Sequence, residues 1–434
     1  MRRSPRNIEI AFNHAGLTHY GGAFFFHEFL RVLHVRNLLA RRLNWSRRNH
    51  DYSLSQMILA LVWPLVLGLD RIETASLLRS NGTFQYLTGL PSFPDPQTLR
   101  RFLMGAPERF HHQLHQLNDE LLQSLIHLPD HRSRLIFDLD STVVPVFGHQ
   151  EQATIGYNPR YRGRRSYHPL LCVEANSSYL WDAQLRPGNA SSWTGSVEML
   201  RAGFAKIPAG IRELRARADS GFCYQPVLQT LEDFRAQYAV VARVYAPLKR
   251  SLPGLSYHRV DARWEMAELE HRFHEWPHAR RFVVARRLIE QQDNDSTLFA
   301  MGHYVYRVWI TNSKLAPPGV RQFYEGRAAI EVRIRELLND FAVGHIPSRV
   351  YSANALYLEI VRFAYNLVTA FQRLCLPVDW QSFTLQSLRH KLFLLPGELT
   401  RPGNRPVLRL REAPYIEQLA GHMMKRLRRI RPFA

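Results

Sequence analysis

An apolar run that contains two acids constrains the fold of this chain most strongly. Residues 134–148 read RLIFDLDSTVVPVFG, a composition typical of a strand buried inside a sheet. Asp138 and Asp140 lie two positions apart in this run, so on a strand their side chains face the same side. Burying an ionised carboxylate costs several kcal/mol unless a cation pairs with it. The sequence therefore predicts a compensating charge, either an arginine such as Arg134 or a divalent metal ion.

The segments that follow this strand alternate in the manner of a mixed α/β fold. Apolar runs at 167–176 and 178–188 flank a turn at 176–178, which predicts a hairpin. The next predicted elements are a helix from about Ser196 to Lys206, a strand at 211–219, a helix near Pro226 to Ala236 and a strand at 238–244. Three meandering strands followed by alternating helix and strand form a mixed sheet. This is the order of ribonuclease-H-like nuclease and integrase cores, whose first acid lies on the first strand and whose second lies at or after the fourth.

More than one structural unit is expected, because 434 residues exceed what one ordinary hydrophobic core holds. Apolar residues recur at helical spacing near both ends, and a polar stretch rich in His and Arg separates two strand-like regions. The predicted regions are a helical N-terminal DNA-binding or dimerisation region (1–130), a first core part (131–244), an insertion (245–301), a second core part with Glu331 (302–345), and a helical C-terminal region with a basic tail (346–434).

The charge balance indicates a polyanionic partner. The chain carries 57 Lys and Arg against 37 Asp and Glu, a formal net charge of +20. Nucleic acid is the predicted partner; an anionic membrane surface is the alternative, but no long basic amphipathic helix is evident. The most apolar run, Met57–Leu69, contains Pro64 and is shorter than the roughly 20 residues of a spanning helix. It predicts a core helix with a kink or break.

Cysteine usage and one missing motif narrow the chemistry further. Cys172, Cys223 and Cys375 are widely spaced, which argues against a disulfide framework or a zinc finger and favours a reducing cytosol. The chain has no Gly-rich phosphate loop, so ATP use is not expected.

Two further acids stand in settings that suit phosphodiester chemistry. Asp219 follows a predicted strand and precedes a turn-like SGF sequence, which would expose its carboxylate at the end of the strand. Tyr324, Arg327, Glu331 and Arg335 follow one another by three and four residues, so they share one face of a predicted helix. An exposed face with weak ion pairs is the plainer explanation of that spacing. Alternatively, three acids brought together by the fold can hold two divalent cations about 3.5–4 Å apart for attack at a phosphodiester.

These motifs together resemble a known family. DLDST around Asp140, ADSGF around Asp219 and Tyr324-x-x-Arg327-x-x-x-Glu331 resemble the DDE transposases of bacterial insertion sequences, in the group with a Y-R-E-K signature. GHQEQATIGYNPRYRGRRSYHPL and YSANALYLEIVRFAYNLV resemble one branch of that group. The expected fold class is α/β, with a ribonuclease-H-like mixed-sheet catalytic core, a β-rich insertion, and flanking helical N- and C-terminal regions.

The resemblance implies roles for individual residues. Asp140, Asp219 and Glu331 correspond to the catalytic, metal-binding acids, with Asp138 as the alternative for the first. The signature lysine falls at Leu338, so Arg335, one turn earlier, is the candidate to replace it. The predicted DNA-contacting residues are Tyr324, Arg327, Arg335, Arg160, Arg162, Arg164, Arg165 and Trp264, with Trp276 as the alternative for stacking on a flipped base. A solvated charge run and core packing are the structural alternatives for the loop arginines and the tryptophans.

The activity implied by the resemblance is that of a DNA transposase. It would bind terminal inverted repeats, cleave DNA at the ends of its element and join the 3′-hydroxyls to target DNA, using Mg²⁺ or, as a substitute, Mn²⁺. The expected partners are double-stranded DNA and a second copy of the chain in a synaptic complex, in the bacterial cytoplasm at the nucleoid, with no membrane and no ATP. A metal-dependent nuclease without strand transfer and a non-catalytic DNA-binding protein derived from a transposase are the alternatives.

Overall fold

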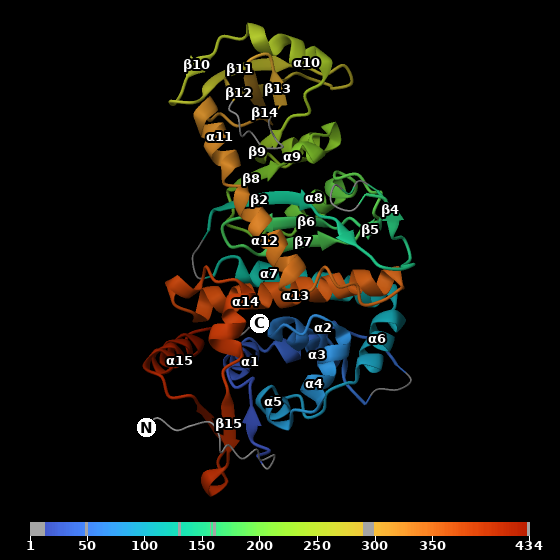
Figure 1. Ribbon diagram of the computed structural model, residues 1–434, viewed down its shortest axis with the longest axis vertical. Helices are drawn as coiled ribbons and strands as arrows, with labels where there is room; N and C mark the ends of the chain where they lie inside the picture. Colours follow the sequence, from blue (N-terminus) through green and yellow to red (C-terminus); the bar gives the residue numbers. More distant parts are fainter. Residues whose placement is uncertain are drawn as a thin grey trace, which may run out of the picture. The chain divides into compact units, whose positions relative to one another are not determined.

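The two ends of the chain belong to one structural unit, and the middle of the chain forms another (Figure 1). The computed structural model describes residues 14–47, 51–128, 132–156, 158, 162–289 and 299–431. Unit 1 comprises Met1–Phe102 and Phe371–Ala434, and unit 2 comprises Leu103–Ala370. Two helices, α6 (Pro96–Gly105) and α13 (Tyr351–Cys375), cross the unit boundaries.

Unit 1 is mainly helical, around the apolar run noted in the sequence. That run forms α3 (Leu54–Leu67), of which nearly every residue is buried, so the predicted core helix is confirmed. A capping box at Ser53 and Gln56 starts the helix, and Gly68, with φ of 81°, ends it. The other helices of unit 1 are α1 (Ala23–Val32), α2 (Val35–Arg42), α4 (Ser76–Arg79), α5 (Gly82–Leu87), α14 (Leu385–Leu388) and α15 (Pro414–Leu427).

A small antiparallel sheet joins the two sequence segments of unit 1. Its order is β1 (Leu17–Thr18), β15 (Gly397–Thr400) and β16 (Val407–Leu410). The sheet pairs backbone from near the start of the described chain with backbone close to its end, which explains why both segments fall in one unit. No helix among the described residues is long and apolar enough to cross a membrane.

Unit 2 is built on one large mixed sheet, as the sequence predicts. Its order is β10-β11-β12-β14-β9-β8-β2-β6-β7, with β13 paired to β14. The strands are β2 (Arg134–Ser141), β6 (Leu170–Glu174), β7 (Leu180–Gln184), β8 (Glu213–Ala218), β9 (Gln237–Val241), β10 (His258–Arg259), β11 (Glu265–His271), β12 (Arg280–Leu288), β13 (Phe299–Met301) and β14 (Tyr304–Thr311).

The five strands of this sheet that come first in the sequence, β2, β6, β7, β8 and β9, confirm the predicted alternation of strands and helices. β2, β6 and β7 form an antiparallel meander, and β8 then runs parallel to both β2 and β9. Helices α8 (Ser196–Ala205) and α9 (Gln225–Asp233) provide the connections that parallel pairing requires. This strand order is consistent with a ribonuclease-H-like core. β6 is buried along its whole length, as expected for a strand covered on both faces.

The polar stretch after β9 extends the same sheet. It contains α10 (Ala246–Ser251) and strands β10 to β13, and β12 pairs antiparallel with β14, which in turn pairs with β9. Two helices follow β14, namely α11 (Pro317–Glu325) and α12 (Ala328–Asn339), and α7 (Glu108–Leu125) precedes β2. A second, three-stranded sheet follows β2 directly, in the order β3 (Val144–Pro145), β5 (Arg165–Tyr167) and β4 (Thr154–Ile155).

Candidate active site

Asp140 lies near the end of β2, and Asp219 directly follows β8, the parallel strand beside it. The register of β2 and β8 pairs Leu139 with Ala218, so the next residue of each chain segment is one of the two acids. Both acids therefore sit where the strands approach their carboxyl ends, the edge at which α/β sheets commonly collect functional groups. Asp219 caps the short turn Ser220–Phe222 and accepts a hydrogen bond from the Gly221 amide at 2.8 Å.

Arg327 provides the cation that the sequence demands for Asp140. Its Nη2 lies 3.0 Å from Oδ2 of Asp140 and donates a hydrogen bond to the Leu139 carbonyl at 3.1 Å. Burial alone would lower the pKa of Arg327, but the charge of Asp140 outweighs it and raises that pKa, so the guanidinium stays charged. The prediction of a compensating arginine is confirmed, but the example of Arg134 is wrong, because Arg134 pairs with Glu213 instead.

The candidate acids carry more negative charge than Arg327 balances. Burial raises the pKa of Asp140 to about 6, and the negative charges of Asp219 and Glu331 act in the same direction, while Arg327 opposes them. The charges of Asp219 and Glu331 thus both act on Asp140, and all three side chains offer only oxygen ligands. Hard divalent cations such as Mg²⁺ and Mn²⁺ prefer such ligands, so these residues fit a divalent metal ion.

The helix that carries Glu331 differs from the prediction. Tyr324 lies in the last turn of α11, and Glu331 lies in α12. Between them, the Arg327 amide donates to the Tyr324 carbonyl three residues back instead of four. Tyr324 and Arg327 are buried, whereas Glu331 and Arg335 are exposed. The predicted single helix is therefore divided: α11 and α12 are separated by a turn at Gly326 and Arg327, and only Tyr324 and Arg327 of the four residues are buried.

Asp138 has a partner of its own. Arg217, opposite it on β8, pairs with both of its oxygens, Nε to Oδ1 at 2.6 Å and Nη2 to Oδ2 at 2.7 Å. Both side chains are almost fully buried. Because Asp138 is almost fully buried and its charge is paired with Arg217 alone, it is less suited than the more accessible Asp140 to be the first metal ligand.

The other predicted DNA-contacting residues lie in two places. Arg162, Arg164 and Arg165 are exposed at and beside β5, where the Arg164 guanidinium lies 5.0 Å from the ring of the exposed Phe147; Arg160 lies outside the described residues. Trp264, by contrast, is partly buried against the cluster that contains Tyr324, and the Arg321 guanidinium lies 4.8 Å from its ring.

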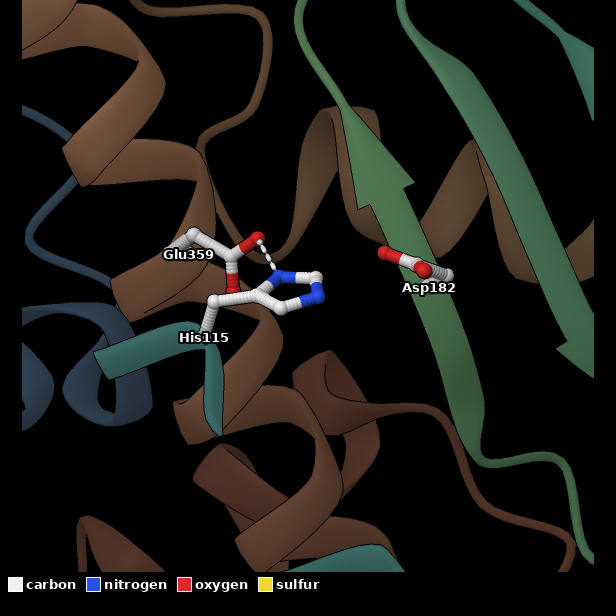
Figure 2. A group of neighbouring side chains, drawn as sticks. All are labelled: His115, Asp182 and Glu359. Atoms are coloured by element: carbon white, nitrogen blue, oxygen red, sulfur yellow. Dashed lines mark hydrogen bonds and ion pairs between the residues drawn. The ribbon is translucent and has the colours of Figure 1, made fainter. Parts of the chain in front are cut away.

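Sequence reasoning missed a polar cluster elsewhere in unit 2. His115 of α7, Asp182 of β7 and Glu359 of α13 place ligand atoms within 4.8 Å of one another (Figure 2). No other His, Cys, Asp or Glu triad does so among the described residues, which means that Asp140, Asp219 and Glu331 are more widely separated. The members come from distant positions in the chain, so no local motif announces the cluster.

A guanidinium already occupies the middle of this cluster. Nη1 of the fully buried Arg362 lies 3.3 Å from Nδ1 of His115, 3.4 Å from Oε2 of Glu359 and 3.8 Å from Oδ1 of Asp182. Asp119 and Lys206 complete the network, with Lys206 Nζ 2.7 Å from Asp119. Three acids therefore face two basic side chains, and a proton on His115, whose pKa is raised, would balance the charge. The cluster is a structural ion network that ties α7 and α13 to β7.

This network makes a prediction about stability. Burial lowers the pKa of His115, but the hydrogen bond and charge of Glu359 outweigh it, so the pKa is raised above 6.5. A raised pKa means that the stabilisation is complete below the unfolded-state value of about 6.5 and is lost as pH rises through the folded-state value. In thermal unfolding, His115→Gln should therefore destabilise the protein more at pH 6 than at pH 9. The exposed His112 of the same helix provides the control variant, His112→Gln; an equal loss at both pH values for His115→Gln would contradict the account.

Comparison with known proteins places the chain in a family. The sequence profile described as transposase DDE domain group 1 matches residues 2–432. Among solved structures, the chain is similar to a cryo-EM structure of a piggyBac transposase synaptic complex with hairpin DNA, at 11% sequence identity and a TM-score of 0.43, covering 87% of this chain and 82% of that one. No curated protein matches the sequence. Because the profile spans nearly the whole chain, the protein belongs to the DDE transposases, a family of polynucleotidyl transferases that use divalent metal ions.

Proposed function

We propose that this transposase binds the terminal inverted repeats of its own element, cuts the DNA at the ends and joins the 3′-hydroxyls to target DNA in one active site. Asp140, Asp219 and Glu331 are the catalytic acids of that site. The observation that carries the proposal is the placement of Asp140 beside Asp219 on parallel strands, with the charge of Glu331 acting on Asp140.

Mg²⁺, or Mn²⁺ in its place, is the proposed metal, held by the three acids. When bound, it activates a water or a 3′-hydroxyl and stabilises the oxygen that leaves phosphorus. The protein's own contribution is orientation. Arg327 fixes one oxygen of Asp140, and the Ser141 amide donates to the other at 2.7 Å, so that the carboxylate cannot rotate freely.

The proposed DNA contacts follow from exposure. Arg335 lies one turn after Glu331 and is exposed like it, so it can reach a phosphate beside the acids; Leu338, at the position of the signature lysine, cannot. Tyr324 and Arg327 are buried and are assigned to shaping the site. Arg162, Arg164 and Arg165 extend the basic surface along bound DNA, and two copies of the chain would be needed to bring two ends together. With a net charge of +20, affinity should fall steeply with salt.

Single replacements test the three acids. Asp140→Ala, Asp219→Ala and Glu331→Ala should each reduce cleavage of a substrate bearing the element's end by about 1,000-fold, because each removes a group that holds charge in the transition state. Binding of the same DNA, measured by gel shift, should persist. Glu198→Ala, at an exposed acid on α8, serves as the control and should cleave normally. Normal cleavage by any of the three variants would remove that residue from the proposal.

Strand transfer separates a transposase from a nuclease. Supplied with precleaved ends that carry a free 3′-hydroxyl and with a target plasmid, the protein should form covalently joined products in Mg²⁺. Sequencing of the junctions measures the outcome directly. Cleavage of end substrates without any joined product would instead support a nuclease, and neither activity would support a non-catalytic DNA-binding protein.

Metal binding should depend on pH through Asp140. A carboxylate must lose its proton to bind a metal, and the pKa of Asp140 is raised to about 6. The affinity for Mn²⁺, measured by electron paramagnetic resonance, should therefore fall about tenfold for each unit below pH 6 and level off above about pH 7. Carboxylates with ordinary pKa values near 4 would give a flat response between pH 5 and 7, and that result would contradict the role of Asp140.

A further inference from the structure

One buried guanidinium touches all three elements that lead to the proposed catalytic acids. Arg217 lies on β8, two residues before Asp219, and holds Asp138 on β2, two residues before Asp140. Its remaining nitrogen, Nη1, donates to the carbonyl of Phe323 at 3.0 Å, near the end of α11. The chain then continues through Gly326 into α12, which carries Glu331.

The strand geometry places this pair directly beneath the site. Side chains two residues apart on a strand point to the same face, so the Asp138–Arg217 pair sits one step below Asp140 and Asp219 on that face. A planar guanidinium that binds a carboxylate through two nitrogens fixes both distance and orientation. The pair therefore fixes β2 and β8 against each other just before the two acids.

The junction between α11 and α12 is shaped to receive the same guanidinium. A Cβ atom at position 326 would lie 2.3 Å from Nη1 of Arg217, so only glycine allows the approach. The ring of Phe323 covers Arg217 at 5.5 Å from its guanidinium carbon. The division between α11, which contains Tyr324, and α12, which contains Glu331, thus lies where Arg217 donates a hydrogen bond to the backbone.

Stability alone does not explain this arrangement. A buried ion pair is costly to desolvate, and apolar side chains of similar size are often equally or more stabilising. Asp138 and Arg217 are only 1% and 5% exposed, so both charges are almost completely desolvated in the folded protein. The two paired hydrogen bonds between Asp138 and Arg217, by contrast, fix the distance and orientation of the two side chains, which apolar contacts do not.

We propose that Arg217 is a positioning residue, which sets the distance from Glu331 to Asp140 and Asp219 by holding the α11–α12 junction against β2 and β8. This inference rests on the proposed function of the three acids. The ligand atoms of the three acids do not all lie within 4.8 Å of one another. The contacts of Arg217 explain how these acids are nevertheless held close enough to share a metal ion. Arg217 itself touches neither substrate nor metal in this role.

Arg217→Lys tests the proposal with the charge retained. Lysine can pair with Asp138 but lacks the planar fork that also holds the Phe323 carbonyl. Cleavage should fall on the order of 100-fold, the scale of a displacement of about 1 Å at a reacting centre, and more Mg²⁺ should be needed for half-maximal rate. In the metal-free protein, hydrogen exchange of the amides at 324–331 should accelerate, while α9 is unchanged.

Arg215→Lys is the matched control. Arg215 lies two residues earlier on β8 and pairs with Glu213, and its guanidinium carbon is 5.3 Å from the ring of Phe323. Among the described residues, Arg215 makes no observed hydrogen bond to Asp138 or to the Phe323 carbonyl. This variant should keep wild-type cleavage, Mg²⁺ requirement and exchange at 324–331. Equal behaviour of the two variants in cleavage and exchange would overturn the positioning role.

A double variant separates positioning from folding. Asp138→Leu with Arg217→Met replaces the ion pair by apolar groups and should unfold at or above the wild-type temperature, yet show the same fast exchange at 324–331. Slow, wild-type exchange in this variant would overturn the inference. Exchange needs no DNA or metal, so a wild-type protein that fails to cleave refutes the proposed function while the exchange comparison still decides the role of Arg217.

Discussion

The buried acids of β2 are the constraint on which unit 2 depends. Asp138 and Asp140 cannot stay ionised in an apolar strand without cations, and the fold supplies two arginines from different elements. Arg217 comes from the neighbouring strand and Arg327 from the junction between α11 and α12. Meeting one electrostatic demand thus brings together segments that are far apart in the chain, and these segments carry Asp219 and Glu331.

The two acids are compensated differently, and this difference separates structure from chemistry. Both oxygens of Asp138 pair with one guanidinium, so its charge is matched within the pair, although burial still raises its pKa. Asp140 pairs with Arg327, but burial and the negative charges of Asp219 and Glu331 outweigh that cation. The pKa of Asp140 is therefore raised to about 6. The ion network around Arg362 shows the opposite outcome, because Arg362, Lys206 and His115, whose pKa is raised, pair with its acids.

The sequence was sufficient where local pattern decides structure. Strand periodicity predicted the meander, the parallel strands and the shared face of Asp138 and Asp140, and the motif around Asp219 predicted a turn at a strand end. It failed where long-range contacts decide. The spacing of Tyr324, Arg327 and Glu331 suits one helix, but the structure has two, divided by a turn at Gly326 and Arg327 where Arg217 donates to the Phe323 carbonyl. Likewise the pairing of both chain ends in unit 1 and the cluster at His115 depend on residues hundreds of positions apart.

Asp140, Asp219 and Glu331 are proposed to share a metal ion that Asp138 does not bind. Anomalous X-ray scattering from crystals grown with Mn²⁺ tests this proposal most directly, because the signal locates the metal and its ligands together. The account predicts density bound by Asp140 and Asp219 with Glu331 as a further ligand, and an intact pair between Asp138 and Arg217. Density on Asp138, or only at the His115 cluster, would contradict it.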